Sequence, residues 1–227
     1  MSSIRVQPIG REGLTIRLRR SAESWSPADD AAWDGMIRAN PRLHDGPIAF
    51  ATEWSDTEIR GEISGYRRLM LRGARQDPAL AMGVTGVLTR RGGSEVLMGR
   101  RSDGVRIYGG LWETAPRGGL DISRPNDQRE IRLGLIDLAS RVSAEAREEL
   151  GIELDPRSLR AVATVIDEQA GSLDVVMAGE ISAELTSPAS WEYTAVGWSP
   201  RRNLGLIGPL SPPTAALAAW LASSSSC

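Results

Sequence analysis

One acidic helix near the middle of the chain constrains the fold more than any other segment. Apolar residues recur at helical spacing over residues 133–150, and Gly151 follows where a left-handed cap would end the helix. Within this segment Glu145, Glu148 and Glu149 stand at positions i, i+3 and i+4, so three carboxylates are expected on one flank. These like charges repel each other, and near a helix C-terminus they also oppose the helix dipole. A divalent cation would relieve both costs, because hard cations such as Mg²⁺ bind oxygen ligands.

The same acids could instead form a solvated face that pairs with Arg141 or Arg147, since short motif matches often have no functional meaning. A segment upstream favours the cation. Residues 111–121 read Leu-Trp-Glu-Thr-Ala-Pro-Arg-Gly-Gly-Leu-Asp, a strand-like stretch that runs into a proline and paired glycines. Glycines let backbone amides and carbonyls approach a pyrophosphate or a metal closely.

Together the two segments resemble the Nudix box, whose pattern is G-x5-E-x7-R-E-U-x-E-E-x-G-U, where U is aliphatic. Gly119 matches the first glycine of the box, and Glu145 matches the glutamate of its Arg-Glu pair. Glu148 and Glu149 match the paired acids, and Gly151 matches the second glycine. The resemblance implies an α/β/α sandwich with a mixed sheet.

The chain departs from the pattern at two places. Ala144 stands where the box has arginine, and Arg141, one helical turn earlier, could substitute for it. Residues 121–132 are inserted between the glycines and the helix, so the first glutamate of the box has no clear counterpart. The departures bear on rate and substrate more than on the fold.

Other elements are expected from periodicity and from the positions of glycine and proline. The helix that starts after Ser26 should bury Trp33. Residues 79–222 would form the Nudix-type α/β domain, residues 1–78 a small N-terminal α+β lobe, and residues 223–227 a flexible tail. Strands are expected at 13–20, 47–54, 57–64, 81–89, 95–98, 111–114, 159–166, 173–181 and 195–199, and further helices at 27–39, 66–71 and 215–222.

The N-terminal lobe resembles, loosely, that of Nudix proteins which cleave UDP-glucose and UDP-galactose. The similarity lies in Trp33, in residues 40–47 (Asn-Pro-Arg-Leu-His-Asp-Gly-Pro), in Tyr66 and in the pair at 77–78 (Asp-Pro). Those proteins also carry an insertion inside the box. Alternatively, the lobe merely caps the sheet edge or mediates formation of a homodimer.

The resemblance implies a Mg²⁺ site, with Mn²⁺ as an alternative, formed by Glu145, Glu148, Glu149 and the backbone carbonyl of Gly119. Glu145 and Glu148 are the candidates for catalysis, and Glu145 is favoured as the general base that activates water. The sequence does not divide the roles of base and ligand among these glutamates.

Phosphate contacts are predicted for basic side chains near the glycine pair. Arg100, Arg101 and Arg117 could each donate paired hydrogen bonds to phosphate oxygens, beside the backbone of Gly118. The resemblance favours Arg100 or Arg101, whereas Arg117 could equally be an exposed side chain at a turn.

Residues 190–198 resemble a late segment from which Nudix enzymes often recruit a further acid. Glu192 is the candidate, although it could be an ordinary surface acid. Tyr193 or Trp191 could stack on a base, or either could belong to the core.

Composition excludes several classes of protein. The net charge of −2 without a basic stripe argues against nucleic-acid binding, and no segment has the apolar length or character of a membrane span or a signal peptide. The single histidine, His44, excludes His-based triads and His-rich metal sites, and the single cysteine, Cys227, cannot form an internal disulfide. A cytoplasmic protein that binds a small-molecule nucleotide is expected, with no nucleic-acid or membrane partner.

The function that these features favour is Mg²⁺-dependent hydrolysis of a nucleoside diphosphate linked to another moiety. UDP-sugar, cleaved to UMP and sugar 1-phosphate, is the leading substrate. ADP-ribose, a dinucleotide or a pathway-specific diphosphate are alternatives, and so is a non-catalytic nucleotide-binding module. An isoprenyl-diphosphate isomerase is disfavoured, because that chemistry uses a cysteine in the core and Cys227 is the last residue.

Overall fold

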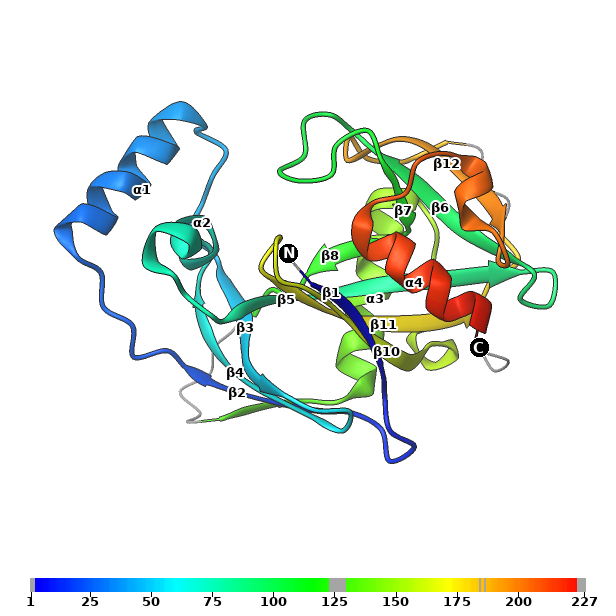
Figure 1. The fold of residues 1–227 in the computed structure, drawn as a ribbon, viewed down its shortest axis with the longest axis horizontal. Helices are drawn as coiled ribbons and strands as arrows, with labels where there is room; N and C mark the ends of the chain where they lie inside the picture. The colour runs from blue at the N-terminus through cyan, green and yellow to red at the C-terminus, as the bar shows by residue number, and fades with distance from the viewer. Residues whose placement is uncertain (1–2, 123–129, 184, 186, 224–227) are drawn as a thin grey trace.

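The computed structural model describes residues 3–122, 130–183, 185 and 187–223 (Figure 1). Within these residues twelve strands form one mixed sheet, and four α-helices and two short 3₁₀ helices surround it. The strands are β1 (Ile4–Pro8), β2 (Thr15–Arg20), β3 (Pro47–Trp54), β4 (Glu58–Gly65), β5 (Leu80–Arg90), β6 (Glu95–Arg101), β7 (Trp112–Thr114), β8 (Arg117–Gly119), β9 (Ile131–Leu133), β10 (Arg160–Asp167), β11 (Ser172–Glu180) and β12 (Tyr193–Pro200). The helices are α1 (Pro27–Ala39), α2 (Tyr66–Arg75), α3 (Leu135–Leu150) and α4 (Pro212–Ser223), with 3₁₀ turns at Pro156–Ser158 and Leu204–Ile207.

Strand β5 is the centre of the sheet. It pairs in parallel with β11 and antiparallel with β3, β6 and β8, and its first nine residues are all buried. A strand buried on both faces reads as a continuous apolar run, which is what this segment shows. The order β1-β10-β11-β5-β3-β4-β2-β9 runs from one edge to the other, and β6, β7 and β12 branch from the far end of β5.

Helices cover both faces of this sheet. Along β11, Leu173, Val175 and Met177 face the core that contains the buried side of α3, whereas Val176 and Ala178 face the core beneath α4. The alternation follows from the period of two in a strand. In Figure 1, α4 lies in front of the sheet and α3 behind it. The expected α/β/α sandwich with a mixed sheet is therefore confirmed.

The N-terminal helix also forms as predicted. Ser26 caps α1 and makes a reciprocal capping box with Asp29, while Pro27 occupies the first turn. Trp33 is buried, as expected. Helix α2 is longer than predicted and ends at Gln76 in a left-handed conformation.

The sheet continues across residue 78. Strand β3 pairs with β5, and β1, at the start of the chain, pairs with β10. The division into a lobe and a domain stays a prediction, because strand pairing alone does not define folding units. Residues 224–227 of the predicted tail and 123–129 of the insertion lie outside the described residues. No helix in the described part of the chain is long and apolar enough to cross a membrane.

Candidate functional site

A cleft of about 360 Å³ lies beside α3 and the glycine pair of β8. Its walls come from segments far apart in the sequence, including α2, β5, β8, α3, β11 and the loop between β6 and β7. The lining residues are Leu69, Ala81, Met82, Gly83, Arg101, Arg106, Ile107, Arg117, Gly118, Gly119, Arg141, Glu145, Glu148, Ser172, Asp174 and Glu192.

Close packing of β8 on α3 explains why a glycine is needed at position 118. A Cβ atom added to Gly118 would lie 2.0 Å from Oε1 of Glu145. The carboxyl group of Glu145 therefore occupies the space that any larger residue at 118 would fill. This contact fixes the carboxylate directly against the backbone of the glycine pair.

The three predicted acids differ in their surroundings. Glu145 and Glu149 are only 7% and 3% exposed, whereas Glu148 is exposed at the cleft. Burial, and then nearby acids, raises the pKa of Glu145 to about 7 although Arg141 opposes the shift. Burial likewise raises the pKa of Glu149 to about 9, although it accepts a hydrogen bond from the backbone N–H of Arg117 at 3.0 Å. Both groups would ionise more readily beside a cation.

Arg141 supplies a cation at this place. Its guanidinium contacts Oε1 of Glu145 at 2.5 Å, donates to the carbonyl oxygen of Gly119 at 3.0 Å and reaches Asp121 at 3.3 Å. The sequence offers Arg141 as a substitute for the box arginine that Ala144 replaces. Its contacts with Glu145 and Gly119 agree with that substitution. Hard oxygen donors that already share a guanidinium have the chemistry that suits a hard metal cation.

Among the described residues no group of three or more His, Cys, Asp or Glu side chains is arranged to hold a metal ion. Glu145 faces Arg141, and Glu149 faces the N–H of Arg117. The proposed set of Glu145, Glu148, Glu149 and Gly119 therefore stays a prediction.

A buried network of charges supports the floor of the cleft. Glu113 is fully buried and accepts from Arg101, from Arg117 at 3.3 Å and from the hydroxyl of Tyr193 at 3.2 Å. Arg117 also pairs with Asp174 on β11. Buried charges need such partners, because an unpaired ion in the interior is costly. The network fixes β7, β8 and β11 relative to one another.

The structure brings most of the predicted site residues to one place, but not all. Arg101, Arg117, Gly118, Gly119, Glu145, Glu148 and Glu192 line the cleft, whereas Arg100, Glu149 and Tyr193 do not. Arg100 is exposed and donates to the carbonyl of Gly110 at 3.1 Å. Tyr193 is 4% exposed, so its ring is part of the core and not available for stacking. Trp191 is 64% exposed.

Three polar residues of the cleft lining were not singled out by the sequence analysis. Asp174 interrupts an apolar strand, and such an isolated acid indicates a buried ion pair. Arg106 and Ser172 belong to segments without a recognisable motif. Their placement depends on how a loop and the start of a strand meet in three dimensions.

No family model and no curated protein matches this sequence. Solved structures that resemble it include the MutT protein of Methanosarcina mazei Go1, at 20% identity and a TM-score of 0.45, covering 62% of this chain and 89% of that one. The NUDIX domain of Shewanella oneidensis NrtR, solved with ADP ribose, is 21% identical with a TM-score of 0.47, covering 66% and 94%. The MutT NUDIX hydrolase of Burkholderia pseudomallei is 22% identical with a TM-score of 0.44, covering 61% and 95%. At such identities and scores, the activities of these proteins do not transfer to this chain.

Proposed function

We propose that this protein is a Nudix-type pyrophosphohydrolase that cleaves a nucleoside diphosphate linked to another moiety, with Mg²⁺ or Mn²⁺. One observation carries the proposal. Glu145, on the helix that resembles the second half of the Nudix box, is buried against Gly118 in a cleft that also presents arginines. Carboxylates beside a glycine backbone suit a metal and a reacting water, and the arginines suit the anionic substrate.

Glu145, Glu148, Glu149 and the carbonyl of Gly119 would hold the metal. When bound, the metal would neutralise phosphate charge and lower the pKa of water. The contacts of the Arg141 guanidinium with Glu145 and with the carbonyl of Gly119 support this assignment for two of the four groups.

Side chains of the cleft would accept the proton that the attacking water loses. The oxygen of water attacks phosphorus, the anhydride P–O bond breaks, and its electron pair leaves with the departing phosphate. Glu145 would take the proton from the attacking water, with Glu148 at the cleft as the other candidate base. Glu192, which also lines the cleft, adds a third glutamate to it.

The leading substrate is a UDP-sugar, giving UMP and sugar 1-phosphate. The support is the likeness of the N-terminal segment and of the box insertion to Nudix proteins that act on UDP-glucose. ADP-ribose is an alternative substrate of the same class. A dinucleotide or a pathway-specific diphosphate would use the same bond cleavage.

A panel of substrates tests the activity. Purified protein with Mg²⁺ or Mn²⁺ is mixed in turn with UDP-glucose, UDP-galactose, ADP-ribose and a dinucleotide, and released nucleoside monophosphate is measured by chromatography. We expect UMP from the UDP-sugars. Preferred cleavage of ADP-ribose would overturn the substrate assignment, and absence of cleavage across the panel with either metal would overturn the enzymatic proposal.

A non-catalytic nucleotide-binding module is the second candidate. It is favoured by Ala144 in the box and by the absence, among the described residues, of an assembled group of three acidic metal ligands. Saturable binding of UDP-glucose without turnover, measured by calorimetry in the presence of Mg²⁺, would support this function over hydrolysis.

Substitution of Gly118 by alanine should reduce activity more than stability. The new Cβ would collide with the end of the Glu145 side chain, which can move aside but then leaves its position in the cleft. We expect UMP release to fall at least about 10-fold, while the free energy of unfolding falls by only about 1–3 kcal/mol. Gly73→Ala is the matched control, because a Cβ there meets nothing within 4 Å. Equal activity of both variants would contradict the placement of Glu145.

A further inference from the structure

Most arginines of the cleft are already held by protein acids. Arg101 pairs with Glu113 and donates to the carbonyl of Ile107 at 3.1 Å. Arg117 pairs with Glu113 and Asp174, as described above, and Arg141 pairs with Glu145. The positive charge of these guanidinium groups is already balanced by protein acids, which weakens their attraction for a phosphate.

Arg106 differs from these three. It lines the cleft and is exposed, and within the described residues it makes no ion pair or hydrogen bond. The hydroxyl oxygen of Ser172, another lining residue, is buried and has no hydrogen-bond partner among the described residues. An unpaired cation and an unsatisfied hydroxyl in one cleft together suit an anionic ligand with several acceptor oxygens.

A hydrogen bond to a buried residue holds the loop that carries Arg106 against the core. Tyr108 donates its hydroxyl to Oδ2 of Asp167 at 2.6 Å, and Asp167 is fully buried. The register of β10 and β11 places Asp167 opposite Ser172. At the base of the loop, the N–H of Gly110 donates to the carbonyl of Arg101 at 3.0 Å. Figure 1 shows this loop, between β6 and β7, extending toward the side of the molecule that carries α1 and α2.

Tyr108 itself adopts a left-handed backbone conformation with φ of 58°. Non-glycine residues rarely adopt that conformation, and it is maintained only when surrounding contacts favour it. The hydrogen bond to Asp167 is such a contact. It sets the position of the loop, and therefore of Arg106 two residues earlier.

We propose that Arg106 binds the phosphate oxygens of the substrate, with the Tyr108–Asp167 hydrogen bond positioning its loop and Ser172 as a second donor. The inference rests on the proposed function, because it assigns the diphosphate contact of the same cleft. Arg106 is a binding residue here, whereas Tyr108 is a positioning residue that acts through the loop.

Binding of inorganic pyrophosphate, measured by calorimetry without added metal, tests the assignment independently of turnover. Arg106→Gln should weaken this binding about 10-fold or more, and Arg106→Lys should restore part of it. Arg202→Gln, which removes an exposed arginine outside the lining, should leave binding unchanged. For hydrolysis of UDP-glucose, Arg106→Gln should raise KM by a similar factor and change kcat less than about 3-fold.

Tyr108→Phe supplies the test of positioning. Loss of the hydroxyl should weaken pyrophosphate binding several-fold, and this effect should disappear when Arg106 is already glutamine. If Tyr108 had only a general structural role, Tyr108→Phe would weaken pyrophosphate binding equally in the parent protein and in the Arg106→Gln variant.

The outcomes separate this inference from the proposed function. If the wild-type protein hydrolyses a nucleotide but Arg106→Gln leaves KM and pyrophosphate affinity unchanged, the inference is overturned and the function stands. If nothing is hydrolysed but Arg106→Gln still abolishes pyrophosphate binding, the anion site stands and the enzymatic proposal fails. A wild-type protein that does not bind pyrophosphate also overturns the inference.

Discussion

Replacement of Glu149 by glutamine should lower the rate of UMP release from UDP-glucose at least about 100-fold, because a metal site supplies several kcal/mol of charge stabilisation. Glutamine has the shape of glutamate and keeps an oxygen that can accept from the N–H of Arg117. The substitution therefore removes the ability of this side chain to ionise beside a metal ion and leaves the packing of α3 intact. Since burial disfavours the charged form of Glu149, we expect the variant to be at least as stable as the parent without metal.

Two measurements distinguish lost charge from lost structure. Mg²⁺ should raise the melting temperature of the parent but have a smaller effect on Glu149→Gln, because the neutral amide is a poorer ligand for a hard cation. Glu153→Gln, an exposed acid just beyond the helix, is the control and should retain both activity and the Mg²⁺ effect. Unchanged hydrolysis by Glu149→Gln would remove this residue from the metal site.

The helix of the site was predictable because its signals are local. Apolar spacing and the cap at Gly151 specify α3, and the structure shows that glycine in the left-handed conformation with φ of 69°. The same holds for α1, where Ser26 and Pro27 mark the start. Whole strands with alternating or continuous apolar patterns were found for the same reason.

What the sequence missed depends on contacts between distant segments. Strands β1, β8 and β9 are each five residues or shorter, and β8 contains two glycines, which disfavour strands in general. Their pairing with β10, β5 and β2 is specified by the assembled sheet. Likewise, three arginines were predicted to contact phosphate from their position near the glycines, but Arg101 is held by Glu113 on β7, and Arg117 is held by Asp174 on β11. Arg106 lies in a loop without periodicity and could be found only from the cleft.

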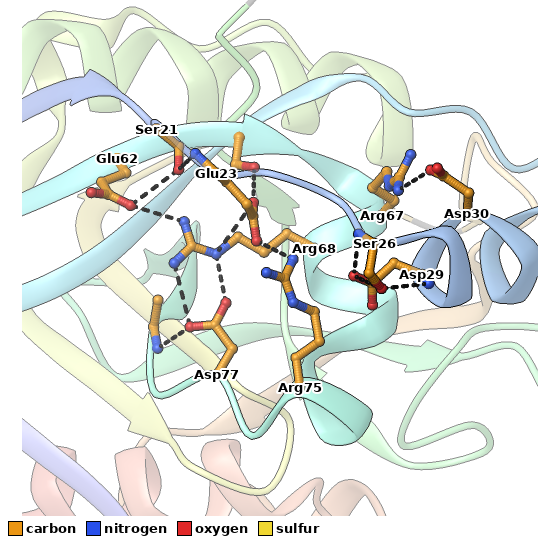
Figure 2. Close-up of polar contacts among 12 residues, drawn as sticks. Ser21, Glu23, Ser26, Asp29, Asp30, Glu62, Arg67, Arg68, Arg75 and Asp77 are labelled. Atoms are coloured by element: carbon orange, nitrogen blue, oxygen red, sulfur yellow. Dashed lines mark hydrogen bonds and ion pairs between the residues drawn. The ribbon is translucent and has the colours of Figure 1, made fainter.

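A second buried charge network lies between α2 and the strands beside it, and none of its residues lines the cleft (Figure 2). Arg68 is 8% exposed and donates to Asp77 at 2.6 and 3.3 Å and to Glu62 at 3.1 Å. Glu23 lies 3.9 Å from the same guanidinium and also pairs with Arg75. One arginine therefore neutralises acids from β4, from the segment before α1 and from the segment between α2 and β5. Burial alone would raise the pKa of Asp77 and of Glu62, but the hydrogen bonds and the charge of Arg68, together with the other hydrogen bonds that each carboxylate accepts, outweigh burial and lower both pKa values.

Substitution of Arg68 by methionine should cost about 3–5 kcal/mol of unfolding free energy at pH 7, because it leaves buried acids without their cation. Arg19→Met is a matched control, since Arg19 contacts the same Glu62 from solvent and its substitution should cost less than about 1 kcal/mol.

Urea denaturation at several pH values adds a second test. Asp77 and Glu62 have lowered pKa values, so their contribution to the free energy of unfolding is present above the unfolded pKa and is lost as pH falls through the folded pKa. The loss of unfolding free energy caused by Arg68→Met should therefore become smaller below about pH 4, where the acids become neutral. If the two variants lose equal amounts of unfolding free energy, or if the loss for Arg68→Met does not depend on pH, then Arg68 stabilises this region by packing and not by charge.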